Sequence, residues 1–196
     1  MGGKRSASAR FGAGNAWLLS GGRRLDIGEA VTSAGPGQGF AMMPWALMQY
    51  GRALRLRPAE AWVLVVLLAH AWEFDGLVFP SLRKTSMSVR VGRATLWRAL
   101  KSLQRLGYIR CVGAGPGGDR RKRFDTRGLY SALAICIAVD PTSAWAKAHG
   151  VLDRDEARQL RGPNGQTFDL DFGAIDALAR RTEGTEPDGI DPEEEG

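Results

Sequence analysis

The sequence contains very little cysteine and histidine, and this limits the chemistry that it can support. Only Cys111 and Cys136 occur among the 196 residues, so there is neither a disulfide framework nor a zinc-finger spacing, as is typical of proteins from a reducing cytosol. His70 and His149 have no cysteine, histidine or carboxylate partners at metal-ligand spacing. No serine or cysteine is paired with a histidine in a nucleophile pattern. We expect no enzymatic activity, no metal and no cofactor.

Long hydrophobic runs are also lacking. The most apolar run, Ala61–Ala71, is well short of the roughly 20 residues that a membrane span needs. The first 14 residues lack the apolar core of a secretion signal. A hydrophobic content of 44% is nevertheless enough to build a core. We therefore expect a soluble cytoplasmic protein with no membrane partner, and no small-molecule ligand is evident.

Acidic residues are scarce in the middle of the chain, so the charge is unevenly distributed. The formal net charge is +6, but residues 51–128 hold sixteen Lys and Arg against five Asp and Glu, a net of +11. Residues 129–196 carry a net of −8. A segment as basic as 51–128 is either a surface for a polyanion or simply a solvated face.

Composition predicts four parts along the chain. Residues 1–39 are a flexible Gly/Ser/Ala-rich segment, mostly irregular with room for a local hairpin, in which 33–39 are a linker. Residues 40–127 form the main domain, and 128–150 a C-terminal helical extension. Residues 151–196 are loop-rich and end in an acidic tail that we expect to be disordered.

Hydrophobic periodicity predicts the elements. Leu96, Ala99, Leu100, Leu103 and Leu106 recur at helical spacing and form a buried seam, which Gly107 ends as a left-handed cap. The apolar helix at 59–73 is expected to be the central, buried one. The predicted helices are 44–54, 59–73, 82–88, 92–106, 126–139, 141–148 and 174–181, and the predicted strands are 77–79, 108–112 and 120–125.

The Gly-rich stretch at 113–118 matches G-x-G-x-x-G. A dinucleotide site would require a helix to start there, whereas Pro116 and a basic strand follow. We interpret it as the tip of a hairpin.

One stretch resembles a known family. "PSLRKTSMSVRVGRATLWRALKSLQRLGYI" (Pro80–Ile109) is similar to the bacterial winged helix-turn-helix domains found in plasmid and phage replication initiators and in related transcription regulators. The resemblance covers about residues 57–112 without gaps. It implies a mainly α fold with a small β-hairpin wing, in which 40–127 is the DNA-binding domain and the partner is double-stranded DNA.

The stretch departs from the family pattern at four positions. Thr85 and Ser86 stand where the family usually has Leu-Ala, and Gly92 stands where a serine usually caps the recognition helix. Arg90 occupies the turn position usually held by glycine. A non-glycine residue in the left-handed region costs of order 1 kcal/mol, which leaves the geometry of this turn open.

The resemblance also implies how DNA is contacted, with helix 92–106 in the major groove. Arg93 and Thr95 lie where helix N-terminal groups favour phosphate, and Arg93 and Arg98 are the candidates for reading bases. Trp97 is better explained as a packing anchor or dimer contact, and we assign Arg105 to solvent. The basic residues at 120–123 suit phosphates. The predicted DNA-binding residues are Arg90, Arg93, Thr95, Trp97, Arg98, Lys101, Arg120, Arg121, Lys122 and Arg123.

Several alternatives remain open. Control of replication and regulation of transcription would use the same residues. The winged helix could also be structural, in a protein-interaction module whose apolar C-terminal segment docks a partner. Gln166–Phe172 resembles sliding-clamp-binding peptides, but with the wrong spacing. A homodimer is possible through the helix at 126–139. The acidic tail either aids solubility or competes with DNA.

Overall fold

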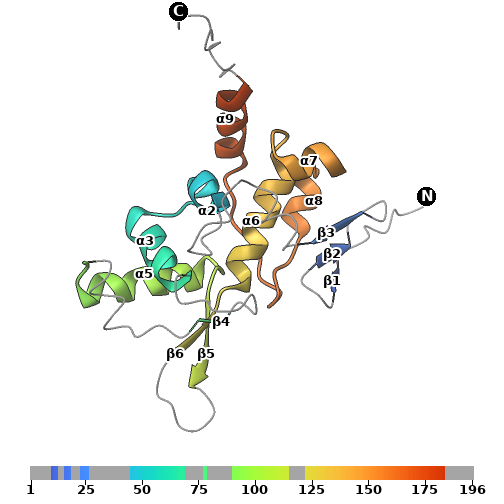
Figure 1. Ribbon diagram of the computed structural model, residues 1–196. Helices are drawn as coiled ribbons and strands as arrows, with labels where there is room; N and C mark the ends of the chain where they lie inside the picture. Colours follow the sequence, from blue (N-terminus) through green and yellow to red (C-terminus); the bar gives the residue numbers. More distant parts are fainter. Residues whose placement is uncertain are drawn as a thin grey trace, which may run out of the picture.

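The computed structural model of the protein describes residues 10–12, 16–18, 23–26, 45–68, 77–78, 90–114 and 122–183. Within them the chain is mainly helical, with two small antiparallel sheets (Figure 1), which confirms the predicted mainly α class with a small β component. The helices are α2 (Trp45–Tyr50), α3 (Pro58–Leu68), α5 (Arg93–Arg105), α6 (Arg127–Val139), α7 (Ala144–His149), α8 (Arg154–Gln159) and α9 (Phe172–Glu183). The strands are β1 (Arg10–Gly12), β2 (Ala16–Leu18), β3 (Arg24–Asp26), β4 (Leu77–Val78), β5 (Arg110–Ala114) and β6 (Lys122–Asp125).

Some predicted features fall outside the described residues. They are the linker at 33–39, His70, the helix at 82–88 with Thr85 and Ser86, most of the hairpin tip at 115–118, Arg120, Arg121 and the acidic tail from 184 onward.

The hydrophobic core is built around α6. All residues from Ser131 to Val139 are buried, and α2, α7, α8, α9 and β3 pack around this helix (Figure 1). Small side chains such as Ala132, Ala134 and Ala138 allow neighbours to approach it from every side. The prediction that the helix at 59–73 is central was therefore wrong, because α3 turns Trp62 to solvent with 63% of its surface exposed.

The position of α6 bears on the expected dimer surface at 126–139. Residues 131–139 are buried within the chain, and Arg127 and Tyr130 are the partly exposed residues of this helix. The predicted boundary between residues 127 and 128 lies at the first turn of α6, and the core is continuous across it.

Part of the N-terminal segment that was expected to be mostly irregular forms a sheet. Strands β1, β2 and β3 pair in that order, antiparallel, with Phe11 opposite Trp17 and Trp17 opposite Leu25. The side chain of Leu25 is fully buried in the same core as α6. This sheet is therefore packed against the helices.

The second sheet contains the predicted hairpin. Its strand order is β4-β6-β5, so β4, which precedes α5 in the chain, pairs with the returning strand of the hairpin. Arg110 and Leu77 both lie opposite Asp125. The first strand begins at residue 110 rather than the predicted 108, because Tyr108 and Ile109 turn into the core and the Tyr108 hydroxyl donates to the Leu54 carbonyl (2.8 Å).

The C-terminal region contains more helix than its composition predicts. Helix α8 was not expected; its N-cap is Asp153, whose carboxylate accepts hydrogen bonds from the backbone N–H groups of Asp155 and Glu156. These two bonds hold the pKa of the Asp153 carboxyl below its ordinary value. Helix α9 agrees with the predicted 174–181 and begins two residues earlier. None of the helices in the described ranges is long and apolar enough to cross a membrane.

Candidate nucleic-acid interface

Helix α5 is held between two positions with left-handed backbone. Before it, Arg90 has a φ of 51°, so the turn keeps the left-handed conformation even though the residue is not glycine. After it, Gly107 has a φ of 78°, which confirms the predicted cap. Gly92 is the N-cap and provides no side-chain hydrogen bond to the helix.

One side of α5 is buried as predicted. Leu96, Ala99, Leu100 and Leu103 are buried, and Leu106 is half-buried just beyond the last helical turn. Trp97 is also half-buried and packs against the core, which agrees with the packing role expected of it. The helix therefore has a fixed orientation, and its remaining side chains have defined directions.

The opposite side of α5 is an exposed basic stripe, formed by Arg98, Lys101 and Arg105. Their spacing of three and four residues places them in line along one face. Arg93 is exposed too, but it precedes Arg98 by five residues and so lies about 140° away around the helix axis. The two arginines predicted to read bases are thus on different sides of the helix, and Arg105, which sequence reasoning assigned to solvent, is in line with Arg98.

The Arg98 guanidinium lies along its own helix. It donates to the Ala94 carbonyl (3.4 Å) and to the Thr95 hydroxyl (3.3 Å), both at the long end of the hydrogen-bond range. Thr95 itself is half-buried. Such long bonds at an exposed site can readily be exchanged for contacts with a ligand.

A groove runs between the start of α3 and the exposed side of α5. Four basic residues line it: Arg57 from the α3 side, and Arg98, Lys101 and Arg105 from α5. Its one acidic lining residue, Glu60, is only 4% exposed and accepts a hydrogen bond from the Arg57 backbone N–H (2.8 Å). Sequence reasoning missed Arg57, because it precedes a helix that carries no other basic residue.

The hairpin lies beside the C-terminal end of α5. Lys122 and Arg123 belong to β6, and the Arg123 side chain is half-buried. Arg110 begins β5 and is exposed. Of the predicted wing cluster the structure thus describes two members, while Arg120 and Arg121 fall in the range 115–121 that it does not describe.

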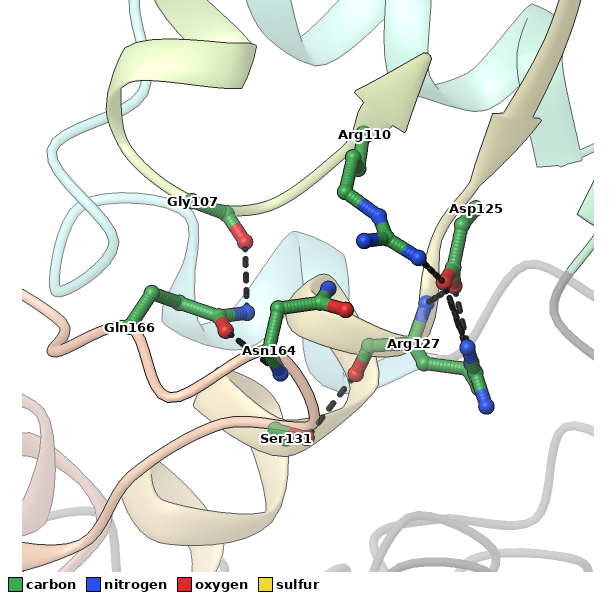
Figure 2. A network of polar contacts seen from close by, with 7 residues as sticks. All are labelled: Gly107, Arg110, Asp125, Arg127, Ser131, Asn164 and Gln166. Atoms are coloured by element: carbon green, nitrogen blue, oxygen red, sulfur yellow. Dashed lines mark hydrogen bonds and ion pairs between the residues drawn. The ribbon is translucent and has the colours of Figure 1, made fainter. Parts of the chain in front are cut away.

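The base of the hairpin is fixed by a charged cluster around Asp125 (Figure 2). This carboxylate is 2% exposed and accepts hydrogen bonds from the Arg127 guanidinium (shortest 2.7 Å) and the Arg127 backbone N–H (3.0 Å), with Arg110 at 3.9 Å. Burial alone would raise the pKa of Asp125, but the hydrogen bonds and charges of the two arginines outweigh it and hold the pKa below its ordinary value. The cluster ties β5, β6 and the start of α6 together.

The corner between α5 and β5 is held by the C-terminal segment. The Gln166 side-chain amide donates to the Gly107 carbonyl (3.2 Å) and accepts from the Asn164 backbone N–H (2.9 Å), as Figure 2 shows. Phe168 stacks on Tyr108, with ring centroids 6.3 Å apart. Gln166 and Phe168 of the clamp-like peptide are therefore already engaged within the chain.

The structure places Cys136 and His149 in defined surroundings. No group of three or more His, Cys, Asp or Glu residues that could hold a metal lies within the described ranges. Burial raises the pKa of the Cys136 thiol, which disfavours its nucleophilic thiolate form. His149 stacks on Trp145 and contacts the Trp145 carbonyl through Nδ1 (3.0 Å).

Comparison with known proteins adds no relative: no protein-family model, no curated protein and no solved structure matches the chain.

Proposed function

We propose that the protein binds double-stranded DNA through a winged helix-turn-helix, with α5 in the major groove and the β5–β6 hairpin as the wing. The observation that carries the proposal is the basic stripe of α5, formed by Arg98, Lys101 and Arg105. An α-helix fits the width of the major groove, and arginine can bond bidentately to guanine. A helix packed on one side and basic on the other is suited to such docking.

The order of elements supports the same proposal. A helix (α3), a short strand (β4), the stretch 79–92, the basic helix (α5) and a two-stranded hairpin follow one another as in the family that the sequence resembles. Pairing of β4 with β6 would join the hairpin to the helices, so that wing and recognition helix approach DNA as one unit. In this arrangement Arg90 and Arg93 flank the N-terminus of α5. Of Arg120, Arg121, Lys122 and Arg123, about half would reach the backbone, because alternate residues of a strand face opposite sides.

The biological process is proposed on the resemblance alone. Plasmid or phage replication initiation, or its control, comes first, and transcription regulation through the same surface is the alternative. Bacterial, cytoplasmic location belongs to the same proposal. Identifying the bound DNA site, as a replication origin or a promoter, would distinguish the two processes.

A protein-interaction module is the second candidate, and one observation favours it. Trp45, Met48 and Trp62, on α2 and α3, are each more than half exposed, and such large apolar side chains on a surface often contact another protein. Binding through them would depend little on salt, whereas DNA binding weakens steeply as salt rises.

The proposal is tested with duplexes selected from a random pool. Arg98→Ala should lose about 1–3 kcal/mol on the selected site and relax base preference at one position, because a bidentate base contact is removed. Arg121→Ala should weaken selected and scrambled duplexes by the same factor, because a phosphate contact carries no sequence information. Affinities are measured by fluorescence anisotropy.

Arg180→Ala is the matched control, since it removes one positive charge from α9, which projects on the side away from the hairpin (Figure 1). Its affinity should equal that of the unmodified protein. If Arg98→Ala and Arg121→Ala changed the affinities for selected and scrambled duplexes in the same way, the assignment of Arg98 to base recognition and of Arg121 to phosphate contact would be wrong.

A further inference from the structure

We propose that the groove between α3 and α5 is a phosphate-binding site, with Arg57 as a ligand outside the helix-turn-helix. The inference rests on the proposed DNA binding and extends it, because it assigns the groove to a backbone phosphate that flanks the bound major groove. It also gives Arg105 a role in holding that phosphate.

The groove carries an excess of positive charge. Within the described ranges, Arg57, Lys101 and Arg105 make no ion pair, and the contacts of Arg98 are to a carbonyl and a hydroxyl. The single carboxylate, Glu60, is buried and directed at the backbone N–H of Arg57. Four cations and one buried carboxylate thus line a concave surface, a net charge of +3, and a phosphate is the ligand that such a site fits.

Glu60 has a structural reason to be there. Pro58 is the first helical residue of α3, and Glu60 at the third position reaches back to the N–H of Arg57, which is the return half of a capping box. The carboxylate therefore stabilises the start of α3 and fixes the backbone of Arg57. This anchors the arginine at the edge of the groove.

Hydroxyl groups complete the site. Thr95 and Ser102 lie seven residues apart on the side of α5 that faces the groove, and both are half-buried. Hydroxyl and arginine side chains are among the groups that bond to phosphate oxygens in protein–DNA complexes. The Thr95 hydroxyl now accepts from Arg98, so it becomes available to a phosphate when Arg98 turns toward a base.

The geometry of DNA favours a backbone phosphate over a base at Arg57. Packed helices lie about 8–10 Å apart, while the major groove is about 12 Å wide. When α5 occupies the groove, the start of α3 therefore lies over one of the bordering sugar–phosphate strands. Arg57 would then fix the register of the protein on DNA without reading sequence.

The test uses Arg57→Ala and Arg57→Lys in the full chain. Arg57→Ala should weaken selected and scrambled duplexes by the same factor and reduce the slope of log K against log salt by about 0.9, the value for one phosphate contact. Arg57→Lys keeps the charge and should retain most of the slope. Arg180→Ala should leave both quantities unchanged, and thermal melting of each variant checks that it is folded.

A second arm separates DNA from a small phosphate-bearing ligand. Inorganic pyrophosphate is titrated into the protein while the arginine Nε–H resonances are followed by NMR. Saturable shifts that are lost in Arg57→Ala support the phosphate site even if the protein binds no DNA, in which case only the proposed function fails. Unchanged DNA affinity and salt slope in Arg57→Ala, with an unmodified protein that does bind DNA, overturn the inference and leave the proposed function intact. Absence of both DNA binding and pyrophosphate shifts overturns both.

Discussion

At the scale of single residues, Gly128 shows how closely the start of α6 approaches the turn that follows α5. A Cβ atom on Gly128 would lie 2.0 Å from the Gly107 carbonyl oxygen, a distance that no real contact has. The same carbonyl accepts a hydrogen bond from Gln166, so it cannot move away without losing that bond. The first turn of α6 and the end of α5 therefore meet through a residue with no side chain.

We expect Gly128→Ala to destabilise the protein by about 1–3 kcal/mol, because the extra methyl group forces backbone atoms apart. The measurement is the free energy of unfolding in urea, with the slope against urea checked for constancy.

Gly92→Ser is the control, since nothing lies within 4 Å of a Cβ at that position and its backbone is in the extended region that an N-cap prefers. A serine there supplies the missing cap and should raise stability by a few tenths of a kcal/mol. If Gly128→Ala did not lower the free energy of unfolding, the close contact between Gly128 and the Gly107 carbonyl would be wrong.

Single residues were also where sequence reasoning was least complete. The seam of Leu96, Leu100 and Leu103 could be predicted because helical periodicity is local. The role of Arg57 could not, since its position beside α5 depends on how two helices pack. Arg105 was assigned to solvent because of its distance along the helix from the N-terminus, although a spacing of seven residues from Arg98 places the two on one face.

At the scale of elements, the charged cluster around Asp125 joins three of them. β6 carries Asp125, β5 carries Arg110 and α6 begins with Arg127. The carboxylate is buried while both guanidinium groups are partly exposed. Protonation of Asp125 would weaken all of these contacts at once and release the base of the hairpin.

This predicts a specific dependence of stability on pH. Because the folded-state pKa of Asp125 is below that of the unfolded chain, about 3.9, its contribution is fully present above that value and is lost as the pH falls through the folded-state pKa. Stability should therefore fall below about pH 4. Asp125→Asn should be less stable at pH 7 and lose less stability on acidification.

Chemical denaturation at pH 7, 5, 4 and 3 measures both effects. The Asp125→Asn variant should keep a residual dependence, because the pKa of Asp153 is also lowered. If the free energy of unfolding changed with pH in the same way for the variant and the unmodified protein, Asp125 would not contribute to the pH dependence of stability.

Some helices and strands could be predicted from the sequence and others could not. α5 and the hairpin followed from local patterns, a leucine period and a glycine cap. α8 did not, because its six residues are largely exposed and its signal is the Asp153 cap with Glu156 three residues later. The central helix was misassigned because uniform hydrophobicity over 59–73 was taken for burial on all sides, whereas the small residues of α6 occupy the centre.

At the scale of the whole molecule, the proposed function depends on where charge collects. The stripe of Arg98, Lys101 and Arg105, with Arg57 across the groove, lies on one side of α5, and the hairpin that follows α5 carries further basic residues. The side of the chain with α8 and α9 holds paired charges, such as Arg154 with Asp176 and Arg158 with Asp155. Charges paired in this way contribute little to long-range attraction, so the unpaired groups dominate the field that a polyanion meets.

The central claim is that this basic surface binds duplex DNA, and its salt dependence tests that claim most directly. Binding of the unmodified protein to a selected duplex is measured by fluorescence anisotropy between 50 and 200 mM salt. Five or more phosphate contacts predict a slope of log K against log salt steeper than about −4. A slope near zero, or no binding to any duplex at 50 mM salt, would contradict the account.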